Sequence, residues 1–167
     1  GQGSAMWKSA DGGKTWKELK NGLPAKPFGR IAFAVAPSAP ENLLAIVESA
    51  NTGLYISGDG GENWKQQSST LNVISRPFYF STLVVDPFDA KRVYRPAYSF
   101  SYSVDGGYSF TDASTPVHAD HHALWINPKN PNQLVLGTDG GVYMSLDKGN
   151  NWRFIDNLPV GQFYHVA

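Results

Sequence analysis

One short motif occurs four times along the chain and constrains the fold more than any other feature. Each copy reads Ser-x-Asp-x-Gly-x-x-aromatic, and the successive serines stand 48, 46 and 42 residues apart. A period of about 40 to 50 residues is typical of repeat architectures in which each repeat packs on its neighbours. The motif residues are Ser9, Asp11, Gly13 and Trp16; Ser57, Asp59, Gly61 and Trp64; Ser103, Asp105, Gly107 and Phe110; and Ser145, Asp147, Gly149 and Trp152.

A second motif runs in phase with the first and indicates what each repeat contains. Val35-Ala36-Pro37, Val85-Asp86-Pro87 and Ile126-Asn127-Pro128 each end a run of apolar residues. Between the motifs, short β-branched and aromatic runs alternate with turn residues, and no long 3.6-residue periodicity is present. We therefore predict an all-β chain with four short strands per repeat, which is the composition of a β-propeller blade. The expected strands are 5–9 and 15–19; 30–36, 43–48, 53–57 and 63–67; 78–86, 92–97, 100–103 and 108–112; 122–127, 133–137, 141–145 and 151–155; and 162–167.

The repeated motif has the chemistry of a tight turn between the third and fourth strands of a repeat. Its Ser and Asp oxygens can accept hydrogen bonds from the amides of the turn, and its glycine supplies the positive φ that such a turn requires. The closing aromatic side chain is expected to be buried between sheets at equivalent places in all four copies. Carboxylates bound to local amides are poorly placed to serve a substrate, so the motif indicates structure rather than acid catalysis.

These motifs resemble the Asp-box, or BNR repeat, of sialidases, sortilin-type receptors, xyloglucanase-like glycoside hydrolases and a plastid photosystem assembly factor. The third copy ends in Phe110, and the fourth carries Lys148 in place of the first glycine. The segments 76–79, 118–122 and 140–143 look like those of large bacterial BNR-repeat proteins labelled glycosyl hydrolases. The resemblance implies a β-propeller of four-stranded antiparallel Asp-box blades, in a protein that is secreted, periplasmic or on the cell surface. It leaves the function open, because the family contains both hydrolases and binding modules.

The repeats predict a partial propeller of about 3.5 blades. Full blades are expected at 25–70, 71–115 and 116–159, with blade fragments at 1–24 and 160–167. The two fragments together still lack a second strand, so we expect that the chain does not close a ring by itself. We interpret it as a segment of one propeller that pairs with the remaining blades of a larger chain. A homo-oligomeric ring is the other arrangement that would cover the exposed strand edges.

Composition excludes several classes of protein. The 14 Lys and Arg residues balance 14 Asp and Glu residues, whereas proteins that bind nucleic acid by electrostatic attraction have a basic excess. The longest apolar stretch, 31–37, is far shorter than the roughly 20 residues of a membrane helix. Cysteine is absent, which excludes disulfides, zinc–thiolate sites and thiol catalysis. We expect no nucleic-acid partner, no membrane span and no cofactor.

A ligand site is expected on the face opposite the Asp-boxes. The loops on that face vary in length and composition, as loops that carry function on a rigid scaffold do. The densest polar segment there, 118–122, holds three of the four histidines. Aromatic and planar polar groups offer stacking faces and directional hydrogen bonds to a sugar or an extended peptide. The expected ligand contacts are Arg76, Tyr79, His118, Asp120, His121 and His122.

Two other interpretations of the histidine segment stay open. His118, Asp120 and His122 have the donor types of a metal site. On an extended strand, however, the ends of such a set lie roughly 13 Å apart, so the three converge only if the chain bends. Pro116 makes a bend possible. Alternatively, the segment forms structural hydrogen bonds at the propeller channel.

The sequence favours a scaffold that binds glycan or peptide ligands over an enzyme. The alternative is a glycoside hydrolase, xyloglucanase-like or sialidase-like. Such an enzyme would need two carboxylates about 5 to 10 Å apart, for which Asp120, Asp139 and Glu48 are the candidates on the expected face. A sialidase is disfavoured, because Arg30-Ile31 is followed by Ala32 rather than by the proline of the Arg-Ile-Pro signature.

Overall fold

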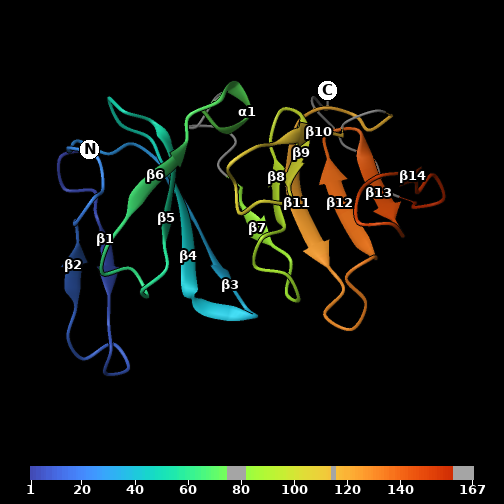
Figure 1. Cartoon of the computed structure of the whole chain (residues 1–167). Coiled ribbons are helices and arrows are strands. Elements are labelled where there is room, and N and C mark those ends of the chain that lie inside the picture. The colour runs from blue at the N-terminus through green and yellow to red at the C-terminus, as the bar shows by residue number, and fades with distance from the viewer. Residues whose placement is uncertain (75–81, 114–115, 160–167) are drawn as a thin grey trace.

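Short apolar runs broken by turns form separate antiparallel sheets that follow one another along the chain (Figure 1). The computed structural model describes residues 1–74, 82–113 and 116–159. In each four-stranded sheet the strands pair in chain order, which confirms the predicted all-β fold of four-stranded blades. The strand expected at 162–167 lies outside the described residues.

The sheets have the following strands. The first sheet pairs β1 (Met6–Lys8) with β2 (Lys17–Leu19). The second contains β3 (Ile31–Ala36), β4 (Ala39–Val47), β5 (Gly53–Ser57) and β6 (Lys65–Ser68). The third contains β7 (Val84–Val85), β8 (Val93–Pro96), β9 (Phe100–Ser103) and β10 (Thr111–Asp112). The fourth contains β11 (His121–Ile126), β12 (Leu134–Thr138), β13 (Gly141–Ser145) and β14 (Arg153–Phe154).

The third strand of each full sheet has the bounds that the sequence predicts, and the fourth strands are shorter than expected. One short helix, α1 (Leu71–Ile74), follows β6 and was not predicted. The strand expected at 78–86 is described only from residue 82, with β7 at its end. Among the described residues, no helix is long and apolar enough to cross a membrane.

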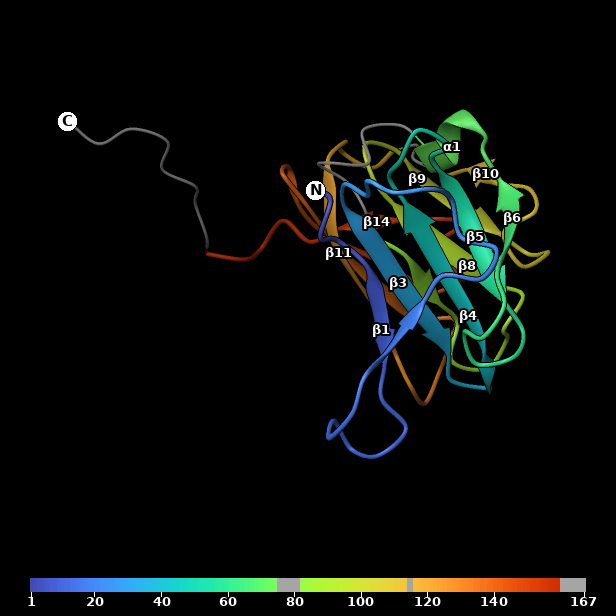
Figure 2. The ribbon, with the colours of Figure 1, turned by 90° about the vertical axis from the view of Figure 1, so that its left-hand side faces the viewer.

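Alternation along the first strand of a sheet sets the packing between sheets. Ala32, Ala34 and Ala36 of β3 are buried against Val85 and Val93 of the third sheet. Side chains that alternate with them point to the opposite face of a strand, and two of these, Phe33 and Val35, are exposed. Figure 2 is turned so that this side of the molecule, with β1 and β3, faces the viewer. The β3 strand of the second sheet therefore carries apolar side chains on both faces.

The Asp-box closes the turn between the third and fourth strands through local hydrogen bonds. The Ser57 hydroxyl donates to the Asp59 carboxylate at 2.7 Å and accepts the amide of Gly61 at 2.9 Å. The Asp59 carboxylate accepts the amide of Asn63 at 2.9 Å. The same three bonds recur in the other copies of the motif. Each of the four aspartates is therefore hydrogen-bonded within its own turn.

In the second, third and fourth Asp-boxes, the glycine two residues after the motif aspartate lies against the preceding sheet. Gly61, Gly107 and Gly149 have φ values of 92°, 87° and 86°. A Cβ atom added to Gly107 would lie 2.4 Å from the Cδ2 atom of Leu54, and one added to Gly149 would lie 3.0 Å from Phe100. The glycine therefore provides both the turn conformation and the close approach between sheets.

The closing aromatic residues pack on the preceding sheet, and this corrects one prediction. Trp64 is buried among side chains of the first and second sheets, Trp152 packs edge-to-face on Phe100, and Phe110 is half-buried against the second sheet. Trp16, expected to be buried like the others, is 60% exposed. The prediction is wrong for Trp16 because no sheet precedes the first box among the described residues.

Acid is expected to destabilise this fold between about pH 4 and about pH 2. Hydrogen bonds from the backbone and side chain of Asn63 and from Ser57 lower the pKa of Asp59 from 3.8 to about 2, and the equivalent bonds lower the pKa of Asp11 to about 2. The unfolded chain therefore takes up protons in this range that the folded chain does not, and stability present above the unfolded pKa is lost as the pH falls. Denaturant midpoints measured from pH 6 to pH 2 test this. The Asp59→Asn variant should show a shallower decline, and equal slopes for variant and parent would contradict the explanation.

Candidate functional site

The polar segment 118–122 lies at the end of the sheets opposite the Asp-boxes. In the fourth sheet His121 pairs with Thr138, while Leu134 at the other end of β12 pairs with Ser145 of the Asp-box. The antiparallel register therefore places the start of β11 and the β12–β13 loop at one end. The Asp-box turn lies at the other, as predicted.

Backbone hydrogen bonds to the third sheet hold this segment in a bent conformation. The amides of Asp120 and His121 donate to the carbonyls of Tyr98 and Ala97 at 3.1 and 2.8 Å. Asp120 has a φ of 62°, in the left-handed region that Asp and Asn adopt more readily than most residues. The bend occurs at Asp120, and the segment thus joins the third and fourth sheets.

His121 packs between the sheets and has no exposed surface. Its Nδ1 lies 2.8 Å from the carbonyl oxygen of Ala97, and its ring meets Phe100 edge-on at 6.1 Å. Burial lowers the pKa of His121, which favours the neutral ring. This geometry corrects the expectation that His121 contacts a ligand. Its hydrogen bond and ring contact agree instead with the structural interpretation of the segment.

His122 points the other way and forms an exposed pair with Asp139. Its Nε2 lies 2.6 Å from the Asp139 Oδ1, and both side chains are about half exposed. The Asp139 amide donates to the Asp120 carbonyl at 3.1 Å, so the two aspartates are neighbours across the loop. Asp120, His122 and Asp139 form the polar group that we call the loop-face cluster.

His118 has its own local partners. Its Nδ1 lies 2.8 Å from the Ala119 carbonyl oxygen, and its amide donates to the Tyr143 hydroxyl at 3.2 Å. Its ring covers Gly140, where an added Cβ atom would lie 2.4 Å from the ring. Two of the three potential metal ligands His118, Asp120 and His122 therefore have other partners. His118 contacts the Ala119 carbonyl, and His122 pairs with Asp139. Among residues 1–74, 82–113 and 116–159, no three His, Cys, Asp or Glu side chains form a group that could hold a metal ion.

The remaining predicted residues lie elsewhere. Glu48, at the end of β4, accepts the amide of Arg30 on its Oε2 at 2.8 Å, and its side chain covers Gly29. This carboxylate binds a backbone amide at the start of β3 in the second sheet, whereas Asp120 and Asp139 lie at the junction of the third and fourth sheets. Arg76 and Tyr79 lie outside the described residues.

Sequence analysis missed one buried charged residue near this end of the sheets. Arg95 of β8 is fully buried, and its Nε and Nη2 donate to the Val73 carbonyl of α1 at 3.3 and 3.0 Å. Burial lowers the pKa of Arg95 from 12.5 to about 10. A charged residue inside an otherwise apolar strand was the available signal. Because a buried charge is costly unless it is hydrogen-bonded or paired, we interpret these two bonds as an anchor of α1 on the third sheet.

Comparison with known proteins identifies the fold. Neither a family model nor a curated protein matches the sequence. A GH74 enzyme of Niastella koreensis matches in structure with a TM-score of 0.65 and 19% identity, over 75% of this chain and 22% of the other. An ancestral GH74 enzyme matches with a TM-score of 0.62 and 20% identity, over 89% of this chain and 21% of the other. This chain has the β-propeller fold.

A second group of propeller structures matches over a larger share of their own length. YCF48 from Cyanidioschyzon merolae has a TM-score of 0.54 at 16% identity, over 76% of this chain and 36% of that chain. A YCF48 bound to D1 peptide has a TM-score of 0.51 at 14% identity, over 80% of this chain and 46% of that chain. The present propeller chain thus spans about a fifth of the GH74 enzymes and less than half of the YCF48 proteins. Identities this low establish the fold alone.

Proposed function

We propose that this propeller chain is a binding scaffold that holds a glycan or peptide ligand at the loop-face cluster. The observation that carries the proposal is the exposed His122–Asp139 pair, with Nε2 and Oδ1 at 2.6 Å. It presents an imidazole at the start of β11 and a carboxylate on the β12–β13 loop, and backbone hydrogen bonds join this place to the third sheet. Such fixed, half-exposed polar groups can make directional hydrogen bonds at little cost in conformational entropy. One YCF48 neighbour is bound to a peptide, which agrees with this class of role.

Further features of the proposal follow the resemblance to Asp-box proteins. His118 and Tyr98 stand beside the cluster and would contact the same ligand, as would Arg76 and Tyr79, which we retain as predicted contacts. We also propose an extracytoplasmic location, and a larger propeller whose other blades complete the ring.

Array binding tests the proposed site. We expect the whole chain to select one ligand class on glycan and peptide arrays. The double variant His122→Ala, Asp139→Asn should bind the selected ligand about tenfold more weakly, as expected for loss of one charge-assisted hydrogen bond. Lys129→Ala, an exposed substitution near the Asp-box end of the same sheet, is the matched control. Unchanged affinity in the double variant would refute the site.

The alternative function is glycoside hydrolysis, with Asp120 and Asp139 as the carboxylate pair. It is favoured by the backbone bond that makes these two residues neighbours, and by the GH74 structures among the matches. Release of reducing ends from xyloglucan by the whole chain, abolished in Asp120→Asn, would establish this function and displace the scaffold proposal.

A further inference from the structure

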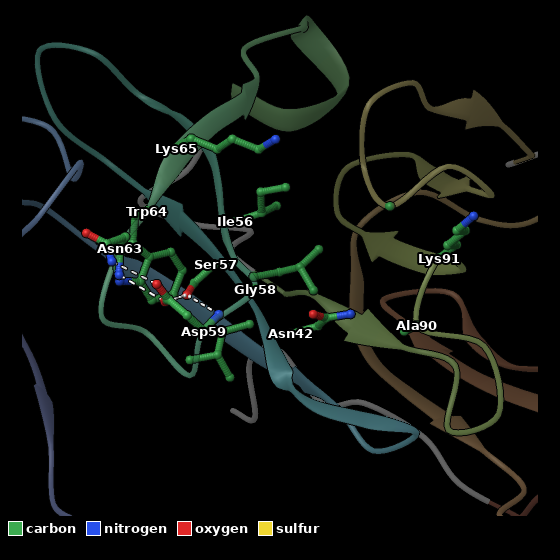
Figure 3. Close-up of a pocket in the computed structure, with 13 residues that line it drawn as sticks. Asn42, Ile56, Ser57, Gly58, Asp59, Asn63, Trp64, Lys65, Ala90 and Lys91 are labelled. Atoms are coloured by element: carbon green, nitrogen blue, oxygen red, sulfur yellow. Dashed lines mark hydrogen bonds between the residues drawn. The ribbon is translucent and has the colours of Figure 1, made fainter.

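A groove opens between the second and third sheets at the end that carries the Asp-boxes (Figure 3). It has a volume of about 590 Å³ and is lined by the apolar side chains of Leu44, Ile56 and Ala90. Lys65 of β6 borders it from the second sheet, and Lys91 of the β7–β8 turn borders it from the third. The groove lies at the opposite end of the sheets from the loop-face cluster, so inferences about it are independent of the proposed function.

The equivalent place between the first and second sheets is filled by a carboxylate of the chain itself. Glu62, the residue after the second glycine of its Asp-box, reaches back to the first sheet. Its carboxylate oxygens lie 2.5 Å from the Lys17 Nζ and 3.5 Å from the Lys8 Nζ. Lys17 begins β2 as Lys65 begins β6, so the two lysines occupy matching positions in their sheets.

The equivalent place between the third and fourth sheets is also bridged. Asn150 follows Gly149 of the fourth box, and its Oδ1 accepts the Tyr102 hydroxyl at 3.3 Å. Beside it, the Arg92 Nη2 donates to the Lys148 carbonyl at 3.0 Å. Two of the three junctions are therefore closed by the same motif position.

The middle junction departs from this pattern. The residue after the second glycine is Tyr108, which is 69% exposed. Within the described part of the chain, neither Lys65 nor Lys91 forms an ion pair. Ile56 stands where the first junction has Lys8, so an apolar surface replaces one of the two cations. The middle junction keeps a lysine at the Lys17 position, but no carboxylate of residues 1–74, 82–113 and 116–159 pairs with it.

We propose that this groove binds a peptide segment that carries a carboxylate beside an apolar side chain. The carboxylate takes the place that Glu62 occupies at the first junction and accepts hydrogen bonds from Lys65 and Lys91. The apolar side chain lies on Ile56 and Leu44. A lysine–carboxylate contact partly screened by apolar walls is stronger than one in open solvent.

The lining favours a peptide over an acidic sugar. Among the described residues that border the groove, Trp64 is the one aromatic side chain, and it is 5% exposed. It therefore offers no face on which a sugar ring could stack. The one carboxylate in the lining, Asp59, is held by Ser57 and Asn63 within its own turn, so it does not neutralise either lysine by contact.

Binding of a short defined peptide tests the proposal. The probe is a fluorescein-labelled, end-capped peptide of sequence Gly-Leu-Glu-Leu-Gly, with Gly-Leu-Gln-Leu-Gly as its neutral counterpart, and the readout is fluorescence anisotropy of the whole chain. We expect the Glu peptide to bind about tenfold more tightly than the Gln peptide. Lys65→Gln and Lys91→Gln should each remove most of that difference, and Lys14→Gln, at an exposed lysine outside the groove, should leave it unchanged.

A variant that adds a carboxylate to the chain tests whether the peptide binds in this groove or is attracted only by the charge of the lysines. In Tyr108→Glu the chain supplies its own carboxylate to Lys65, as Glu62 does to Lys17, and the Glu peptide should then bind about tenfold more weakly. Tyr108→Gln removes the same ring without adding charge and should retain binding. The proposal is overturned if the two peptides bind equally, if Tyr108→Glu has no effect, or if an oligogalacturonate binds this groove and the peptide does not. Lys129→Ala, an exposed substitution outside both the groove and the loop-face cluster, should leave peptide affinity unchanged. Array binding at the loop-face cluster is measured separately, so failure here is distinguishable from failure of the proposed function.

Discussion

Trp64→Ala should lower the free energy of unfolding by about 3 to 5 kcal/mol, and Trp16→Ala should lower it by less than about 1 kcal/mol. The two tryptophans close equivalent Asp-boxes, and each indole Nε1 donates to the carbonyl of the second glycine of its own box. They differ in surroundings. Trp64 is 5% exposed and Trp16 is 60% exposed.

The comparison isolates the packing between sheets, because the local turn is the same in both variants. Urea denaturation followed by far-ultraviolet circular dichroism would measure both losses. Nearly equal losses would mean that the indole acts within its own turn, contrary to the contacts of Trp64 with the first sheet.

Gly107→Ala should destabilise the chain by about 2 to 5 kcal/mol, whereas Gly13→Ala should cost only about 1 to 2 kcal/mol. Both glycines have nearly the same positive φ, 87° and 89°, so the backbone strain of an added Cβ atom is common to both. At Gly107 that atom would also lie 2.4 Å from the Leu54 Cδ2 of the second sheet. At Gly13 its nearest neighbour is the Trp16 ring at 3.8 Å.

The difference in stability loss between these variants measures the cost of the contact between an added Cβ atom and the preceding sheet. Leu54→Ala in the Gly107→Ala background is the informative second change, because it removes the colliding methyl group. If the collision causes the excess loss, the two substitutions together should cost less than the sum of the two alone. Additive losses would contradict the explanation.

Much of the fold could be read from the sequence because the information is local. Every hydrogen bond that Ser57 and Asp59 make within the motif spans four residues or fewer. The motif therefore predicts its own turn wherever it occurs. Strand ends were less predictable. β14 covers only Arg153–Phe154 of the expected 151–155, because pairing with the neighbouring strand decides where the outermost strand begins and ends.

The sequence predicted the end of the sheets at which the segment 118–122 lies, but not the surroundings of its side chains. His121 and His122 are adjacent in sequence and identical in type, yet one is buried on a carbonyl of the third sheet and the other is paired with Asp139 in solvent. Because successive side chains of a strand point to opposite faces, the sequence predicts that the two rings point in opposite directions. It does not predict which of the two rings is buried. That assignment depends on Ala97 and Phe100, more than twenty residues away.

The sequence by itself determined the repeat, the turn chemistry and the end of the sheets at which each loop lies, since all three follow from contacts between near neighbours and from strand alternation. Only the tertiary structure decided which equivalent residues share an environment. Trp16 and Trp64, or Glu62 and Tyr108, occupy the same motif positions, but their burial and partners depend on the sheet that lies alongside. Those contacts join residues some forty to sixty positions apart, and no local pattern encodes them.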